Sequence, residues 1–168
     1  MSLKIYSLLQ KIIPELQSQQ IPQDEDFDSF DEWINESVNI FHYIELKNYY
    51  DNGIEDNYYL SEHKVDVESL QNAIEADVIE AFDEVDDDVE NDDFDLEDQM
   101  DALERVEEII FDKIKNVASP FHLTLIIIYH ENPYWLLVPT EDDNQLNQIV
   151  DAFNEAFNQD GDLNMAVY

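Results

Sequence analysis

Apolar residues recur every three or four positions through the first two thirds of the chain, which is the spacing of amphipathic helices. The first predicted helix carries Leu3, Tyr6, Leu9, Ile13 and Leu16, with Pro14 expected to kink or restart it. The second predicted helix carries Phe27, Phe30, Ile34, Val38 and Phe41, and continues to Ile44. The run Asp51-Asn52-Gly53 is a turn signal that closes it. Residues 57–60 fit either a short strand or an extended linker.

Two longer helices are predicted at about 65–85 and about 95–117. In the first, the apolar positions are Val67, Leu70, Ile74, Val78, Ala81 or Phe82, and Val85. In the second, they are Leu96, Met100, Leu103, Val106, Ile110, Ile114 and Val117. The intervening stretch, residues 86–95, is predicted to be an acidic loop because only Val89 and Phe94 are apolar there.

The pattern changes after Pro120. Residues 121–130 (FHLTLIIIYH) are almost continuously apolar, which is typical of a central strand. A turn leads into a second strand at 134–138, and a helix from about 140 precedes a last strand at 163–168. The sequence therefore predicts an α+β fold, in which about four N-terminal helices precede a small three-stranded sheet in ββαβ order with one crossover helix.

Length and composition indicate one folded domain over 1–168, mainly helical over 1–118 and ββαβ over 119–168. Hydrophobic residues make up 44% of the 168 residues, so the chain has enough apolar side chains for a core. It has no cysteine and no apolar run long enough to span a membrane. We expect a cytoplasmic protein.

Charge is the most unusual property of this chain. It has 42 acidic and 7 basic side chains, a formal net charge of -35. Between Lys64 and Arg105 there is no basic residue, and Glu75 to Glu108 contains 18 carboxylates. Solubility alone needs a net charge of only about 2–8 in a small domain. Phosphates of nucleic acids and anionic membranes would be repelled, whereas a basic protein would be attracted.

We therefore predict a surface that binds a basic partner protein, with carboxylates that steer it and tyrosines that anchor it. Its predicted residues are Glu75, Asp77, Glu80, Asp83, Glu84, Asp86, Asp87, Asp88, Glu90, Asp92, Asp93, Asp95, Glu97, Asp98, Tyr58 and Tyr59. Carboxylates crowded in this way are expected to have raised pKa values.

Three functions fit these observations. The first is a non-enzymatic inhibitor of a basic protein, most concretely an immunity protein against a nuclease-type toxin. The second is a DNA mimic that sequesters a DNA-binding protein, because carboxylates along a rigid helix can imitate phosphate spacing. The third is an acidic structural or adaptor domain whose charge serves solubility only.

No catalytic, cofactor or metal motif is present. The four histidines form no His-x-x-x-His pair, there is no glycine-rich phosphate loop, and the acids at 86–95 lack the glycine of a calcium-binding loop. We therefore expect no enzyme activity, no cofactor and no dedicated metal site.

In size, acidity and lack of cysteine, the chain resembles bacterial immunity proteins against nuclease toxins, and also acidic DNA-mimic proteins. The resemblance lies in charge and size and covers no motif. It implies a small acidic inhibitor of a toxin, or a mimic of the DNA backbone.

Overall fold

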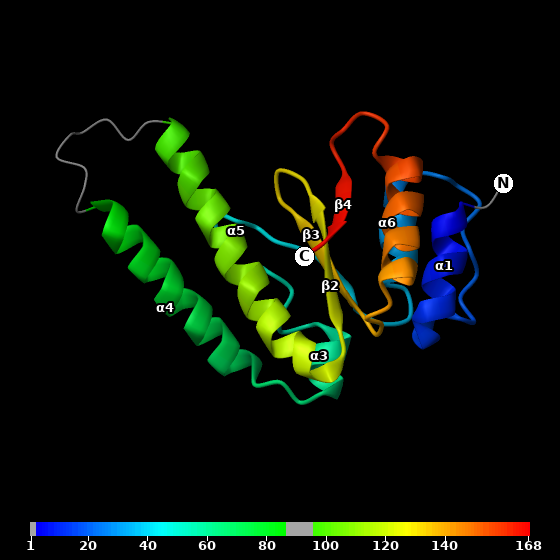
Figure 1. The fold of residues 1–168 in the computed structure, drawn as a ribbon, viewed down its shortest axis with the longest axis horizontal. Helices are drawn as coiled ribbons and strands as arrows, with labels where there is room; N and C mark the ends of the chain where they lie inside the picture. The colour runs from blue at the N-terminus through cyan, green and yellow to red at the C-terminus, as the bar shows by residue number, and fades with distance from the viewer. Residues whose placement is uncertain (1–2, 87–95) are drawn as a thin grey trace.

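The computed structural model describes the backbone of residues 3–86 and 96–168, and the side chains of residues 3–83 and 98–168. A β-sheet lies between two groups of helices (Figure 1). On one side are α1 (Lys4–Ile12), α2 (Phe27–Ile34) and α6 (Asp143–Phe157). On the other side, α4 (Val67–Asp86) and α5 (Leu96–Ala118) form a helical hairpin. Three short helical segments complete the chain, η1 (Pro14–Leu16), α3 (Tyr58–Glu62) and η2 (Ser119–Phe121).

The sheet has four strands in the order β1-β3-β2-β4, and every neighbouring pair is antiparallel. They are β1 (Phe41–Tyr43), β2 (Thr124–Tyr129), β3 (Tyr134–Val138) and β4 (Asn164–Val167). The predicted α+β class, the ββαβ order and the crossover helix α6 are confirmed, and β2 has neighbours on both sides as expected. The difference is the fourth strand, β1, in a segment predicted to be helical.

The continuous apolar run of β2 follows from its position between the two helical layers. Ile126 is in register with Leu136, whose other neighbour Phe41 contacts α2. Ile127 is in register with Trp135 and therefore points to the opposite layer. Both isoleucines are fully buried, so neither face of β2 can be polar.

The second predicted helix is wrong beyond Ile34, because Asn35 ends α2 and directs the chain into a strand. The Asn35 Oδ1 atom accepts hydrogen bonds from the backbone nitrogens of Ile40 and Phe41, at 3.1 and 2.9 Å. Its Nδ2 atom donates to the Phe41 carbonyl oxygen at 2.8 Å. The pairing of β1 with β3 joins segments almost 100 residues apart, and helical periodicity contains no information about such a partner.

Residues 57–60 form neither of the two predicted alternatives, a short strand or an extended linker, and instead begin a helix. Asn57 caps the short helix α3, since its side chain accepts a hydrogen bond from the backbone nitrogen of Leu60 at 3.1 Å. Aspartates begin three other helices in the same way: Asp26 for α2, Asp66 for α4 and Asp142 for α6. Several carboxylates of this chain therefore stabilise its own helix ends.

The layer of α1, α2 and α6 is joined to the sheet by a cluster of aromatic rings. Phe30 of α2 contacts Phe41 of β1 and Phe153 of α6, with ring centres 5.7 and 5.5 Å apart. Tyr6 of α1 contacts Trp33 of α2 edge to face, at 4.8 Å. Such edge-to-face pairs add stability to the area they bury.

The opposite face of the sheet is joined to α4 through buried polar groups. The indole nitrogen of Trp135 donates to the carbonyl oxygen of Asn52 at 2.6 Å. The side-chain amides of Asn52 and Gln71 exchange two hydrogen bonds, of 3.0 and 3.1 Å. Gly53 has a φ of 77°, and a Cβ there would come within 2.4 Å of the His42 ring. The predicted turn at 51–53 is thus a packed junction between the sheet and α4.

His42 belongs to the same junction and is buried in its neutral form. Its Nε2 atom lies 3.1 Å from the Asn57 Nδ2 atom, which is a donor, so Nε2 accepts. Burial lowers the pKa of His42 to about 4.

In each edge strand of the sheet, the backbone groups of one residue are hydrogen-bonded to an asparagine side chain. Asn35 binds Phe41 of β1, as described above, and Asn154 of α6 binds Met165 of β4. The Asn154 Oδ1 atom accepts from the Met165 backbone nitrogen at 2.8 Å, and its Nδ2 atom donates to the Met165 carbonyl oxygen at 3.0 Å. These amides occupy backbone groups that would otherwise pair with a strand of another molecule.

Replacing Asn154 with alanine is expected to lower the free energy of unfolding by about 1–3 kcal/mol, because two backbone groups of Met165 lose their partners. The unpaired backbone groups of Met165 should also promote association at high salt, where the repulsion between two copies of net charge -35 is screened. Urea unfolding and light scattering measure the two effects. Asn147→Ala, at an exposed position of the same helix, is the control. Equal behaviour of the two variants would contradict the protective role.

Replacing His42 with glutamine is expected to flatten the dependence of stability on pH. The unfolded chain binds a proton at His42 near pH 6.5 and the folded protein only near pH 4, so stability falls as the pH falls through this window. The parent protein is expected to lose about 3 kcal/mol of its free energy of unfolding through protonation of His42. The variant lacks this contribution. Urea unfolding across this pH range measures both slopes. Parallel slopes would show that His42 does not cause the loss.

Candidate functional site

The predicted partner-binding carboxylates are concentrated on the α4–α5 hairpin. Glu75, Asp77, Glu80 and Asp83 lie on α4, and Asp98 lies on α5. Glu84 and Asp86 of α4 and Glu97 of α5 have described backbones only. Asp87, Asp88, Glu90, Asp92, Asp93 and Asp95 lie outside the described residues, as does most of the predicted acidic loop.

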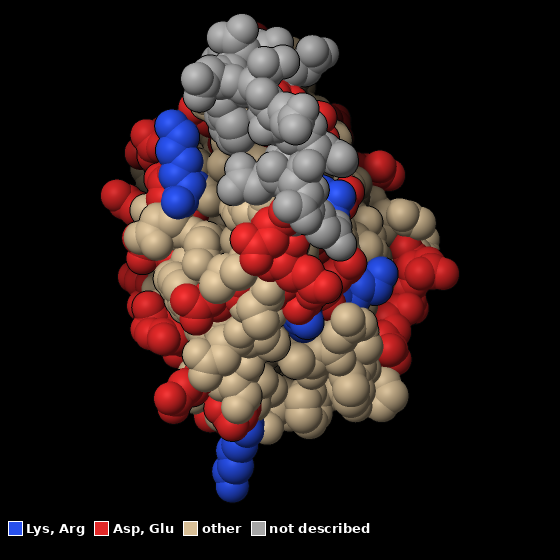
Figure 2. Space-filling view, turned by 90° about the vertical axis from the view of Figure 1, so that its left-hand side faces the viewer, with Lys and Arg blue, Asp and Glu red and all other residues tan. Residues whose placement is uncertain are grey.

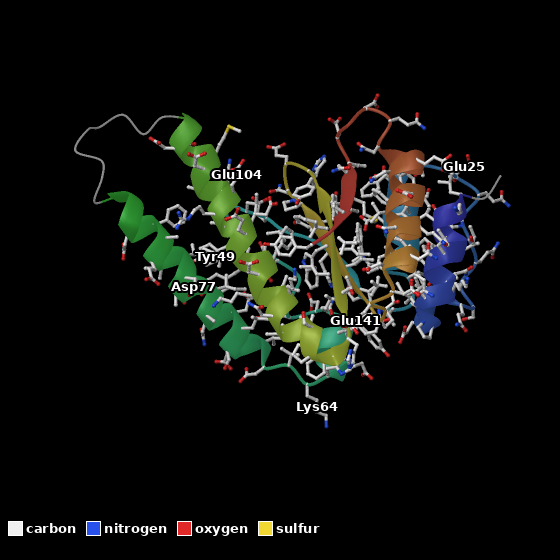
Figure 3. All side chains as sticks on the ribbon, in the orientation of Figure 1. Glu25, Tyr49, Lys64, Asp77, Glu104 and Glu141 are labelled. Atoms are coloured by element: carbon white, nitrogen blue, oxygen red, sulfur yellow. The ribbon has the colours of Figure 1, made fainter. Side chains whose placement is uncertain are left out.

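The α4 carboxylates do not form one row along the helix. The Tyr50 hydroxyl donates a hydrogen bond to Glu75, which raises the pKa of Tyr50 to about 12. Asp77 forms an ion pair with Lys113 of α5, at 2.7 Å between Oδ2 and Nζ (Figure 3). Glu75 and Asp77 therefore face different neighbours, whereas Glu80 and Asp83 are exposed.

Acidic side chains also occur beyond the hairpin. Viewed from the hairpin side, carboxylates appear over the hairpin and along both flanks of the molecule, with lysine and arginine side chains among them (Figure 2). Both flanks seen in this view therefore contribute to the negative field, and any specific recognition needs a local feature in addition to charge.

The two predicted tyrosine anchors lie on α3. Tyr59 is buried, and its hydroxyl donates to the Glu15 Oε2 atom at 3.0 Å. Burial, with Glu15 nearby, raises the pKa of Tyr59. Tyr58 is half-buried and contacts the Tyr59 ring edge to face at 5.3 Å. Neither tyrosine is among the residues that line two cavities beside α5, of about 600 and about 220 Å³.

A different pair of tyrosines lines the larger of these two cavities. Between α5 and the strands β2 and β4 lies a surface cavity of about 600 Å³. Its lining residues are Glu104, Glu107, Glu108, Phe111 and Asp112 from α5, Tyr129 from β2, and Tyr168, which follows β4. We call these seven residues the acidic hollow. It combines four carboxylates with three aromatic rings, and Glu104 extends from α5 at one side of it (Figure 3).

Tyr168 is held firmly within the acidic hollow. Its backbone nitrogen donates to the Leu125 carbonyl oxygen at 3.0 Å, and its hydroxyl donates to the Asp112 Oδ1 atom at 2.8 Å. Its ring lies 5.4 Å from the Phe111 ring, and the Lys115 Nζ atom lies 5.4 Å from its centre. Tyr168 thus already contacts one cation through its aromatic face.

The carboxylates of the acidic hollow repel one another. Partial burial, then the charges of Glu104 and Glu108, raise the pKa of Glu107. The pKa of Asp31 on α2 is also raised, by burial and then by the charges of Asp28 and Glu32. The expectation of raised carboxylate pKa values holds for these two residues. It fails for Asp26 and Asp66, whose pKa values are lowered by hydrogen bonds from helix N-termini.

Tyr129 and Tyr168 are not among the residues predicted from the sequence, and the predicted carboxylates end at Asp98. Their signal in the sequence was weak: each is a single tyrosine at the end of an apolar strand segment. The antiparallel pairing of β2 with β4 sets Tyr129 opposite Asn164. It also places Tyr168 beside Leu125, so both tyrosines lie along β2 and line the cavity next to α5. Only knowledge of that pairing would have placed the two rings beside α5.

Within the residues whose side chains are described, no group of three or more histidines and carboxylates is arranged to hold a metal ion. His122 lies 2.8 Å from Glu141 in an exposed pair. No helix in the described ranges has the length and apolar character that crossing a membrane requires.

Comparisons of this chain with protein-family models, with curated proteins and with solved structures found no match.

Proposed function

We propose that this protein is a non-enzymatic acidic inhibitor that neutralises a basic partner protein, most concretely an immunity protein for a nuclease-type toxin. The observation that carries the proposal is the acidic hollow, where four carboxylates of α5 line the same cavity as the exposed ring of Tyr129, the half-buried ring of Tyr168 and the buried ring of Phe111. The proposed setting is the cytoplasm. The proposed partner is a protein, and neither nucleic acid nor a membrane is bound directly.

The net charge of -35 would accelerate the encounter with a basic partner. Steering of this kind raises association rates towards about 10⁸–10⁹ M⁻¹s⁻¹ at low salt. A nuclease presents lysine and arginine side chains where it binds phosphates, so the same groups would be attracted to carboxylates. Occupying them would block access of the nucleic acid.

The aromatic rings of the acidic hollow supply apolar contact area, which charged groups alone do not provide. Tyr129 is 45% exposed and sits beside the carboxylates of α5. An arginine or lysine side chain entering there meets carboxylates and aromatic faces together, and loses water on binding. Contacts of this kind at the centre of an interface slow dissociation.

The arrangement of α4 supports an inhibitor more than a DNA mimic. A mimic needs carboxylates in rows that follow phosphate spacing. On α4, Glu75 is engaged by Tyr50 and Asp77 by Lys113, so these two acids are turned to different neighbours. A local acidic patch around aromatic rings fits an inhibitor better.

The test begins with affinity capture from the native cell at low salt, followed by kinetics with the purified partner. Association is expected to slow at least tenfold as ionic strength rises from about 0.1 M to about 1 M, because the Debye length falls from about 10 to about 3 Å. If the partner is a nuclease, one equivalent of this protein should abolish cleavage. An association rate that does not change with salt would refute electrostatic steering.

Variants of the acidic hollow locate the interface. Glu104→Gln with Glu108→Gln is expected to slow association several-fold more than the matched pair Asp151→Asn with Glu155→Gln on α6. Tyr129→Ala is expected to speed dissociation about tenfold or more. Stopped-flow and surface-binding kinetics measure these rates. If both double variants slow association equally, the negative charge acts through the molecule as a whole. The acidic hollow is then excluded as the interface.

A further inference from the structure

The half of the α4–α5 hairpin farthest from α3 leaves large apolar side chains in contact with solvent. Ile79 and Phe82 of α4 are 49% and 40% exposed, and Met100 of α5 is 63% exposed. Nearer the base, Ile74 of α4 and Ile110 of α5 are fully buried. The apolar faces of both helices therefore continue beyond the part that the rest of the protein covers.

A groove runs between the two helices in this exposed half. It is lined by Ala81 and Phe82 of α4 and by Asp98, Asp101, Ala102, Arg105 and Val106 of α5, with a volume of about 220 Å³. Ala81 and Ala102 are too small to fill the space between the helices, and Phe82 supplies an apolar wall. We call these seven residues the hairpin groove. It shares no lining residue with the acidic hollow.

Charge limits what can occupy the hairpin groove. A second copy of the chain would bring another net charge of -35 against this one, so self-association is opposed. Nucleic acids and anionic membranes are repelled for the same reason. Asp98 and Asp101 line the groove on α5 together with one cation, Arg105. Asp83 adjoins Phe82 on α4, so acidic groups outnumber basic ones there. An occupant with lysine or arginine flanking an apolar stripe complements these charges.

Shape favours a helix. A groove between two antiparallel helices accepts a ridge of side chains spaced three or four residues apart on a third helix. Apolar residues of the incoming helix would pack against Phe82 and over Ala81 and Ala102. Basic residues one helical turn away on its flanks would reach the aspartates, as in other cases where an amphipathic helix lies in an apolar groove.

We propose that the hairpin groove docks a basic amphipathic helix of the partner protein. The inference rests on the proposed function, since it assumes a basic protein partner, and adds a second contact on another face of α5. The acidic hollow binds single cationic side chains, whereas the hairpin groove binds an apolar stripe with basic borders. Together they would hold a partner on two sides of one helix.

The first experiment uses a synthetic peptide of about 18 residues, built from leucine and lysine in amphipathic helical order. Its control has the same composition in an order that destroys the apolar stripe. Fluorescence anisotropy is expected to show at least tenfold tighter binding of the amphipathic peptide by the full-length protein. Equal binding of both peptides would show attraction by charge alone and overturn the inference.

Substitutions locate the binding of that peptide. Phe82→Ser removes the apolar wall and Ala102→Leu fills the groove, and each is expected to weaken binding at least tenfold. Tyr43→Ser, at another exposed aromatic residue on β1, is the matched control and should change binding less than twofold. Circular dichroism melting confirms that each variant is folded. Unchanged binding in both groove variants would overturn the inference.

The hollow variant Glu104→Gln with Glu108→Gln separates this inference from the proposed function. Loss of peptide binding in that variant alone would overturn the inference and leave the acidic hollow as the binding site. If the captured partner binds the groove variants as well as it binds the parent, the inference is also overturned. If the captured partner shows no salt dependence, the proposed function fails, and the peptide result still decides whether the groove accepts a basic helix.

Discussion

The hydrogen bond from the Trp135 indole to the Asn52 carbonyl oxygen, at 2.6 Å, holds the two halves of this protein together. Asn52 also exchanges two hydrogen bonds with Gln71 of α4, so the base of the α4–α5 hairpin has a fixed position relative to the centre of the sheet. Apolar packing alone would allow α4 to slide or rotate, whereas paired amides allow one register. This junction positions α4, whereas α5 also packs directly against β2, and the two helices together form the hairpin groove.

The second constraint is a charge of -35 that must remain in contact with water. Among the residues with described side chains, the buried polar ones are Gln19, His42, Asn52, Asn57 and Gln71, and none is a carboxylate. Burial keeps His42 neutral at pH 7. Some surface carboxylates cap helices and Asp77 pairs with Lys113, and these groups also remain in contact with water. The core thus avoids the cost of buried charge, and most of the negative field remains available to a partner.

α5 combines these features because its sides have different neighbours. One side, with Phe111 and Asp112, faces Tyr168 and forms the acidic hollow. Another side faces α4, where Ala102 and Val106 leave the hairpin groove. The proposed inhibitor would use the general negative field to speed association with its partner. The two local features would select that partner and slow its dissociation. Charge then explains attraction to many basic proteins, and the local shape explains a preference among them.

The sequence by itself determined the α+β class, the two long acidic helices, the central position of β2 and the crossover helix α6, because each depends on periodicity within one segment. It could not place β1, since the pairing of Phe41 with Leu136 is a contact between distant segments. Nor could it show which tyrosines line a cavity: Tyr59 is buried against Glu15, whereas Tyr129 of β2 and Tyr168 after β4 line the same cavity beside α5. Local patterns fix secondary structure, but contacts made across the chain decide which side chains share a surface.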